Sequence, residues 1–287
     1  MNIKATIFKA VLAGLLIIGW MSTSALAQDN TKGAADEAYK AEMKKDKTGT
    51  NPLNFTFDVR LINEYQWLNT DGDGYQDVIT LDYRVPFGKN NKWQLRIKAR
   101  GASLEADFND DGIDDVNESG FGDTDIRFMT IPYLNPKNFI GAAAVGAEFF
   151  LNTATEDALG SGAFSVGPFV FLGILNPFGP GSIFAPGYQH IFSIDEEEGR
   201  SRVHRGVIDL YAIKTFGANQ FWGYLDPQIV LDYENDIEFM LVEVQVGMMM
   251  DKLIGTNGHS IYILPSFGVG AYRPYDVSLE VAYKVVW

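Results

Sequence analysis

Two short stretches of the sequence carry oxygen-bearing side chains at the spacing of a calcium-binding loop. The longer stretch, residues 107–118, reads DFNDDGIDDVNE and fills every slot of the twelve-residue calcium template, with Gly112 at the sharp turn. Calcium prefers several hard oxygen ligands, so this stretch predicts a structural Ca²⁺ site. The ligands would come from Asp107, Asn109, Asp111, the carbonyl of Ile113, Asp115 and Glu118.

The shorter stretch, residues 69–77, reads NTDGDGYQD and repeats the pattern less completely. Thr80 stands where the template has a bidentate carboxylate, so we expect weaker Ca²⁺ binding here. An alternative applies to both stretches: Asp, Asn and Gly are common hairpin-loop residues, and acidic loops keep a surface soluble. The candidate ligands of the shorter stretch are Asn69, Asp71, Asp73, the carbonyl of Tyr75 and Asp77.

A second set of charged residues alternates with apolar residues along the chain. The stretch WQLRIKAR, residues 93–100, places Trp, Leu, Ile and Ala on one face of a strand and Gln, Arg, Lys and Arg on the other. Such faces are too highly charged for a dry core, so they predict a water-filled lumen. The predicted lumen residues are Arg60, Arg84, Arg96, Lys98, Arg100, Asp226, Asp232, Glu243 and Glu280.

These charges admit two arrangements. The arginines and lysine come from early strands and the carboxylates from late ones, so they could face each other across a barrel and create a transverse field. Alternatively they pair locally, for example Arg127 with Asp123 or Asp125, and fill a narrow lumen. A barrel of twelve strands lies between the filled eight-stranded barrels and the open sixteen-stranded porins, so size does not decide between them.

The elements that must position these residues are β-strands with a period of two. Turn signals rich in Gly, Asn and Pro divide the chain into twelve such strands, an even number typical of a bacterial transmembrane, antiparallel up-and-down β-barrel. A lipocalin-like barrel would instead turn its apolar face inward. The predicted strands are 54-68, 77-87, 93-106, 122-134, 139-153, 163-176, 182-195, 202-217, 221-234, 236-250, 259-273 and 276-287.

The two ends of the chain indicate an outer-membrane location in a Gram-negative cell. Residues 1–27 have the positive start, apolar run and Ala-Leu-Ala site of a secretory signal. Residues 28–53 are polar and predict a periplasmic segment, with a plug inside the lumen as the alternative. The barrel occupies 54–287, and an even strand number places both termini in the periplasm. The alternating strand that ends at Trp287 resembles the C-terminal signal by which the barrel-assembly machinery recognises its substrates.

Composition excludes several classes of function. The net charge is −14, the wrong sign for binding nucleic acid. No cysteine is present, which removes disulfides and thiolate chemistry. Some twelve-stranded outer-membrane barrels are calcium-dependent phospholipases, but none of His190, His204 and His259 begins the corresponding His-x-Ser-Asn run. We therefore predict that the protein is not an enzyme.

The middle of the chain resembles a known group of proteins. Gly120-Phe121-Gly122-Asp123, the block AEFFLNTATEDALGSGAFSVGP at residues 147–168 and QHIFS from Gln189 are similar to the outer-membrane transporters of the MetA-pathway phenol-degradation family, many of them labelled "neuromedin U". The resemblance covers most of residues 51–287, although Asn152 stands where that family commonly has a proline. It implies a barrel that passes small, aromatic or hydrophobic compounds, and it assigns no catalytic residues.

Two functions remain open at this point. The first is a narrow outer-membrane channel for small solutes, with charged lumen residues as selectivity elements and acidic outer loops stiffened by Ca²⁺. The second is a non-conducting barrel whose acidic loops bind lipopolysaccharide, surface polysaccharide or another partner through divalent cations. The two differ in whether ions cross the barrel.

Overall fold

The computed structural model describes residues 48–50, 55–108, 115–135, 137–217, 220–251, 255 and 258–287. The predicted signal segment, residues 1–27, lies outside these described residues. No helix in the described part of the chain is long and apolar enough to cross a membrane.

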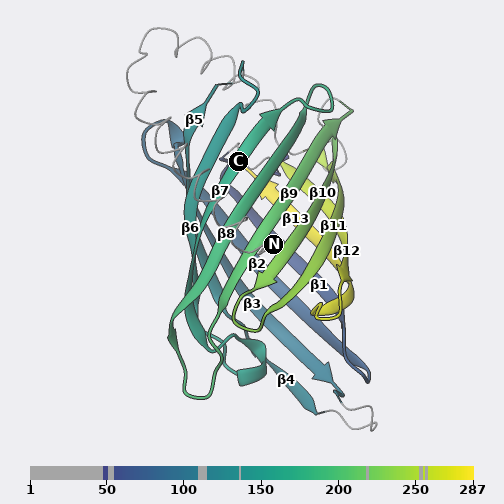
Figure 1. Cartoon of the computed structure of the whole chain (residues 1–287). Coiled ribbons are helices and arrows are strands. Elements are labelled where there is room, and N and C mark those ends of the chain that lie inside the picture. The colour runs from purple at the N-terminus through teal and green to yellow at the C-terminus, as the bar shows by residue number, and fades with distance from the viewer. Residues whose placement is uncertain are drawn as a thin grey trace.

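The described chain is almost entirely antiparallel β-sheet (Figure 1). Two short 3₁₀ turns, η1 (Lys89–Asn91) and η2 (Asp157–Leu159), lie in connections between strands. The strands are β1 (Asp58–Leu68), β2 (Gly74–Phe87), β3 (Trp93–Ala106), β4 (Val116–Phe121), β5 (Thr124–Leu134), β6 (Ala142–Leu151), β7 (Ala163–Leu175), β8 (Ser182–Glu196), β9 (His204–Phe216), β10 (Phe221–Asp232), β11 (Ile237–Met249), β12 (His259–Val269) and β13 (Tyr275–Val286).

The sheet closes on itself. Consecutive strands pair with each other, except that β5 pairs with β3 instead of β4. β1 pairs with β13 along its whole length, from Asp58 opposite Val286 to Leu68 opposite Tyr275. Figure 1 shows the tilted strands wound around a single interior. The short β4 pairs only with the end of β3 and continues the line of β5, so the wall has twelve positions. The predicted twelve-strand antiparallel barrel is therefore confirmed.

The sequence predicts one strand over residues 122–134, whereas the structure has two, β4 and β5, which together form the fourth strand position of the wall. Strand pairing with β3 already begins at Val116, opposite Ala106, and is interrupted at Gly122 and Asp123 before β5 starts. At the interruption the Gly122 N–H donates to the carbonyl of Arg100 at 3.0 Å. The acidic connection between β3 and β4 is consequently shorter than the sequence pattern predicts.

The apolar faces point outward and the polar faces inward. Leu61, Leu81 and Ile263 are 56, 50 and 52% exposed, whereas Asp82 and Lys284 are fully buried. This is the inverse of a soluble barrel, because water-soluble proteins bury their large apolar side chains. An apolar outer surface and a polar interior are typical of barrels that stand in lipid.

Aromatic side chains gather on the outer surface near both rims. The rim at which β1 starts and β13 ends, here the terminal rim, carries the pairs Phe57–Tyr83, Phe57–Trp287, Phe87–Trp93 and Phe216–Phe221. The opposite rim, here the loop rim, carries Tyr65 with Trp67 and Tyr75, and a group formed by His190, His204 and Tyr233. Two such belts are typical of a barrel whose rings sit at both membrane interfaces.

Candidate functional site

The barrel encloses a cavity of about 480 Å³. Inward-facing side chains from strands all around the wall line it, and Gly49 and Thr50, which precede β1, close part of it at the terminal rim. This volume is in the usual range for a small-molecule site of roughly 300–1,000 Å³. The cavity is the candidate functional site.

Asp82 of β2 organises the cationic side of the cavity. Its carboxylate accepts from Arg84 and from Arg96 of β3, each at 2.9 Å, and Asp82 itself is fully buried. Arg60 of β1 pairs with Asp58 at 2.8 Å. Asp82 lies directly opposite Arg60 on β1 and opposite Lys98 on β3, so the strand pairing places a carboxylate between two basic side chains. The arginines are therefore held in fixed positions along the wall.

Two further ion pairs continue this wall. Arg100 pairs with Asp125 at 2.5 Å, and Arg127 pairs with Glu148 at 2.5 Å. Glu148 also accepts from Gln189 of β8 at 3.1 Å. Charge-assisted hydrogen bonds of this kind are stronger than neutral ones and orient both partners.

The carboxylates on the other side of the cavity are paired differently. Glu243 accepts from the Tyr224 hydroxyl at 2.9 Å, and Glu280 accepts from the Tyr262 hydroxyl at 2.5 Å. Asp226 accepts from Gln228 at 3.3 Å through one carboxylate oxygen only. Among the described residues, none of these three carboxylates forms an ion pair.

The structure brings together most of the predicted lumen residues. Asp232 is the exception: at the end of β10 its carboxylate accepts from the backbone N–H groups of Glu234 and Asn235, both at 3.0 Å, and so stabilises the turn to β11. The predicted lumen residues that line the cavity are Arg60, Arg84, Arg96, Lys98, Arg100, Asp226, Glu243 and Glu280.

Local pairing, one of the two arrangements left open by the sequence, is present on one side of the cavity. The basic side is locally paired, with Arg127 on Glu148 rather than on Asp123 or Asp125, while the acidic side keeps carboxylates without basic partners. Sequence reasoning offered Asp125 as a partner of Arg127, whereas Asp125 pairs with Arg100. It missed the counter-charge Glu148, and also Arg205 and Asp209 of β9, which line the cavity. The alternation of Arg205, Val207, Asp209 and Tyr211 along β9 is the signal that could have found the last two.

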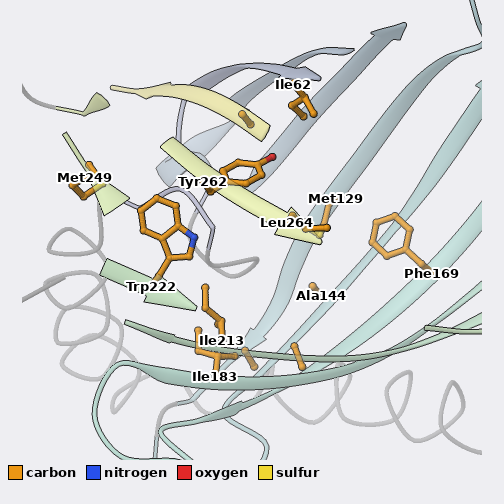
Figure 2. Close-up of a cluster of buried hydrophobic side chains, with 13 residues drawn as sticks. Ile62, Met129, Ala144, Phe169, Ile183, Ile213, Trp222, Met249, Tyr262 and Leu264 are labelled. Atoms are coloured by element: carbon orange, nitrogen blue, oxygen red, sulfur yellow. The ribbon is translucent and has the colours of Figure 1, made fainter. Parts of the chain in front are cut away.

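Apolar side chains line much of the lumen near the terminal rim. Ile183, Ile213, Trp222, Met249 and Tyr262 project from five strands into the same interior (Figure 2). Gly247 of β11 makes room for Trp222, because a Cβ at this position would lie 2.1 Å from the indole ring. These side chains reduce the width of the passage where β1 begins and β13 ends.

Residues 48–50, the described part of the predicted periplasmic segment, contact inward-facing side chains at this rim. Arg60 donates to the Gly49 carbonyl at 2.6 Å, and the Tyr211 hydroxyl donates to the Thr50 carbonyl at 2.9 Å. The buried ammonium of Lys284 donates to the Thr50 hydroxyl at 3.1 Å and lies 4.8 Å from the centroid of the Trp222 ring. This short piece of chain therefore occupies part of the lumen.

The shorter acidic stretch lies between β1 and β2 at the loop rim. Asn69 donates to the carbonyl of Ala271, in the connection between β12 and β13, at 3.1 Å. Asp77 lies inside β2, where it accepts from Asn63 at 2.5 Å. Tyr75 is also a strand residue, and its hydroxyl donates to Glu105 at 2.5 Å. The remaining candidate ligands, Asp71 and Asp73, lie in the connection itself.

The longer acidic stretch lies directly beside the shorter one. The N–H of Asp107 donates to the carbonyl of Asp73 at 2.8 Å, which joins the two connections. The carboxylate of Asp115 accepts from the Phe108 N–H at 2.8 Å. Glu118 is a residue of β4 opposite Leu104, and its Oε2 is buried without a hydrogen-bond partner. Asn109, Asp111 and Ile113 lie outside the described residues, and the described residues contain no group of three or more metal-binding side chains.

Asp123 holds the connection between β6 and β7. This connection lies within residues 147–168, the block that resembles the phenol-degradation family. The carboxylate of Asp123 accepts from the N–H groups of Thr153 and Ala154, both at 3.2 Å, and from the N–H and hydroxyl of Ser161 at 2.7 and 2.8 Å. Arg100, in the lumen, donates to the carbonyl of the same Asp123 at 2.8 Å. Asp123, which follows Gly122 at the interruption of the wall, thus connects the loop between β6 and β7 with the charged wall of the cavity.

Comparisons with known proteins agree on the architecture. No family model and no curated protein matches the sequence, so the similarity to the phenol-degradation family stays a resemblance. Among solved structures, the COG4313 outer membrane channel from Pseudomonas putida F1 is similar with a TM-score of 0.60 and 12% identity, over 81% of this chain and 96% of that one. The NanC porin is similar with a TM-score of 0.50 and 13% identity, over 80% of this chain and 98% of that one. At these identities the likeness shows the fold alone, which is the closed twelve-strand barrel of outer-membrane channels and porins.

Proposed function

We propose that this protein is an outer-membrane channel for small solutes in a Gram-negative cell. The observation that carries the proposal is a closed barrel with an apolar outer face and a charged interior cavity of about 480 Å³. Charged side chains inside a barrel need water or opposite charges, and a water-filled lumen is a route for solutes. Lipid and lipopolysaccharide surround the outer face in this proposal, and the terminal rim faces the periplasm.

The lumen also supports the finer proposal that the solutes include small aromatic compounds. Phe171, Tyr211, Tyr224 and Tyr262 line the cavity together with the charged groups. Aromatic rings offer apolar contact area and stack on other rings at centroid separations of roughly 4.5–7 Å. A solute with an aromatic body would find such contacts on several sides of the passage.

The test is single-channel conductance of the mature chain, residues 28–287, refolded into a planar bilayer. We expect discrete conductance steps from a narrow pore. Replacing Arg96, Lys98 and Arg100 together with Gln should shift ion selectivity toward cations, because Asp82 and Asp125 then lose basic partners. Absence of conductance would overturn the channel and favour a non-conducting barrel that binds a partner through its loops.

The proposal includes Ca²⁺ bound between the two acidic connections at the loop rim. The contact between Asp107 and Asp73 places these connections side by side, and the buried, unpartnered Oε2 of Glu118 is an oxygen that a cation would satisfy. Bound Ca²⁺ would neutralise carboxylates that otherwise repel each other, and so would hold the two loops together.

Calcium binding is tested by the unfolding midpoint in urea with a chelator and with about 10 mM Ca²⁺. At a dissociation constant of about 10⁻³ M we expect Ca²⁺ to add about 1.4 kcal/mol to the free energy of unfolding. Asp73→Asn and Asp111→Asn should reduce this gain, whereas Asp157→Asn, in the connection between β6 and β7, should leave it unchanged. Equal gains in all four proteins would show a general salt effect instead.

A further inference from the structure

Many charged side chains in the cavity form ion pairs with each other, and those that do not are candidates for binding a solute. Arg60, Arg84, Arg96, Arg100 and Arg127 form ion pairs with Asp58, Asp82, Asp125 and Glu148, and Asp82 is shared by two arginines. Six other charged residues line the same cavity without an ion pair to any described residue. Two of them, Glu243 and Glu280, each accept a hydrogen bond from a tyrosine hydroxyl. The other four are Lys98, Arg205, Asp209 and Asp226. These four are the groups left to interact with a solute.

Of the four, Asp226 has the carboxylate whose hydrogen-bonding capacity is least satisfied. It is only 7% exposed, and its Oδ1 is buried without a hydrogen-bond partner. An unsatisfied buried carboxylate oxygen is costly, so a donor supplied by a bound molecule stabilises it. Asp209 adds a second carboxylate beside it, because Asp209 lies opposite Gln228, two residues from Asp226 on β10.

The surroundings of these carboxylates suit an organic cation. Tyr211 and Tyr224 lie two residues from Asp209 and Asp226 on the same inward faces, and their ring centroids are 5.1 Å apart. Ammonium groups bind favourably over aromatic rings and beside carboxylates. The acidic side therefore combines the two features that recognise a protonated amine.

Lys98 lies across the lumen from this group. In the order of the closed wall, β10 is the sixth strand from β3 in either direction, counting β4 and β5 as one wall position. Lys98 is the sixth residue of β3 and Asp226 the sixth of β10, and both strands begin at the terminal rim. The unpaired amine and the unpaired carboxylate consequently face each other at a similar depth. Arg205 lies on β9 nearer the loop rim, where an anionic group entering from that side would meet it first.

We propose that the cavity binds small amphoteric solutes, which carry a protonated amine and a carboxylate or another anionic group on one molecule. The amine is directed to Asp226 and Asp209, and the anionic group to Lys98. This inference rests on the proposed channel function and names its solute class. An aromatic ring between the two groups is compatible with the tyrosines that line the cavity.

The test compares four solutes of similar size: 4-aminobutyrate, 4-hydroxybutyrate, 4-amino-1-butanol and 1,4-butanediol. Saturation-transfer NMR measures their binding to the refolded mature chain, and single-channel current measures block by each. We expect the amphoteric 4-aminobutyrate to bind and to block at a concentration about tenfold lower than either singly charged analogue, since each charge adds one charge-assisted contact.

Two isosteric variants on opposite walls test the assignment. Asp226→Asn should remove the advantage of 4-aminobutyrate over 4-hydroxybutyrate, and Lys98→Gln its advantage over 4-amino-1-butanol. Arg202→Gln is the matched control, because Arg202 is 66% exposed in the connection between β8 and β9 and does not line the cavity. Conductance with equal block by all four solutes would overturn this inference and leave the channel. Binding of 4-aminobutyrate without conductance would overturn the channel and leave the site.

Discussion

At the residue scale, single carboxylates determine where the basic side chains of the lumen lie. Asp82 is fully buried and joins Arg84 to Arg96, which come from two different strands. A buried ion pair adds little net stability compared with apolar packing, but removal of one partner leaves an uncompensated charge. The arginines would otherwise be free to change rotamer, so Asp82 acts mainly by fixing the shape and charge of the wall.

Replacement of Asp82 with Asn should therefore be strongly destabilising. We expect the free energy of unfolding to fall by about 3 kcal/mol, because Arg84 and Arg96 lose their shared counter-charge in a partly desolvated lumen. The measurement is the urea midpoint of the refolded barrel. Asp276→Asn is the control: its pair with Arg273 at 2.6 Å is solvent-accessible, with Asp276 52% exposed, and should contribute less than about 1 kcal/mol. Similar losses in the two variants would contradict this account.

At the scale of elements, the interruption between β4 and β5 is the place where the connection between β6 and β7 is attached to the wall. Gly122 and Asp123 leave the strand pairing, and the Asp123 carboxylate then collects four donors from the connection between β6 and β7. Leu159 of this connection is buried against Leu104 and Ala106 of β3. The loop is thus packed onto the rim by one apolar contact and one carboxylate.

Asp123→Ala should release this loop without opening the barrel. We expect a loss of about 2–4 kcal/mol locally, since several hydrogen bonds to a charged acceptor disappear together. Amide exchange at residues 153–161 should accelerate, and a glutamate-specific protease should cut after Glu156 faster. Asp157→Ala removes a neighbouring carboxylate that is 93% exposed and should change neither readout. Unchanged exchange in Asp123→Ala would show that Leu159 alone holds the loop.

At the scale of the whole molecule, closure depends on the pairing of the first strand with the last. β1 and β13 pair over their full length, and the N–H of Trp287 donates to the carbonyl of Phe57 at 2.9 Å. The Trp287 side chain adds only an edge contact with Phe57 and is 69% exposed. The indole is therefore a minor part of the closed structure, so its predicted role as an assembly signal can be tested separately from its structural role.

Trp287→Ala separates these two roles. The purified, refolded variant should lose no more than about 1 kcal/mol, because the backbone contact remains and an aromatic pair contributes about 0.5–1.5 kcal/mol. In cells the amount of barrel in the outer membrane should fall several-fold, as expected if the C-terminal aromatic is an assembly signal. Trp287→Phe should restore the amount. Equal losses of stability and of cellular yield would assign Trp287 a structural role only.

The sequence by itself determined the class of fold and the two faces of the wall. Period-two alternation is a local property of a strand, so residues such as Arg96 and Lys98 can be assigned to a polar face without knowledge of any neighbour. Outward and inward could also be distinguished, because a dry core does not accommodate so many charges.

Only the tertiary structure decided which groups act together. The pairing of Arg127 with Glu148, the four donors on Asp123 and the contacts of residues 48–50 all join segments that are distant in sequence. Such contacts depend on strand register and barrel closure, which alternation does not encode, since a polar face is compatible with any partner on the adjacent strand. For the same reason the sequence indicated a charged lumen, whereas the structure showed which of these charges form ion pairs and which, among them Lys98, Arg205, Asp209 and Asp226, form none with a described residue.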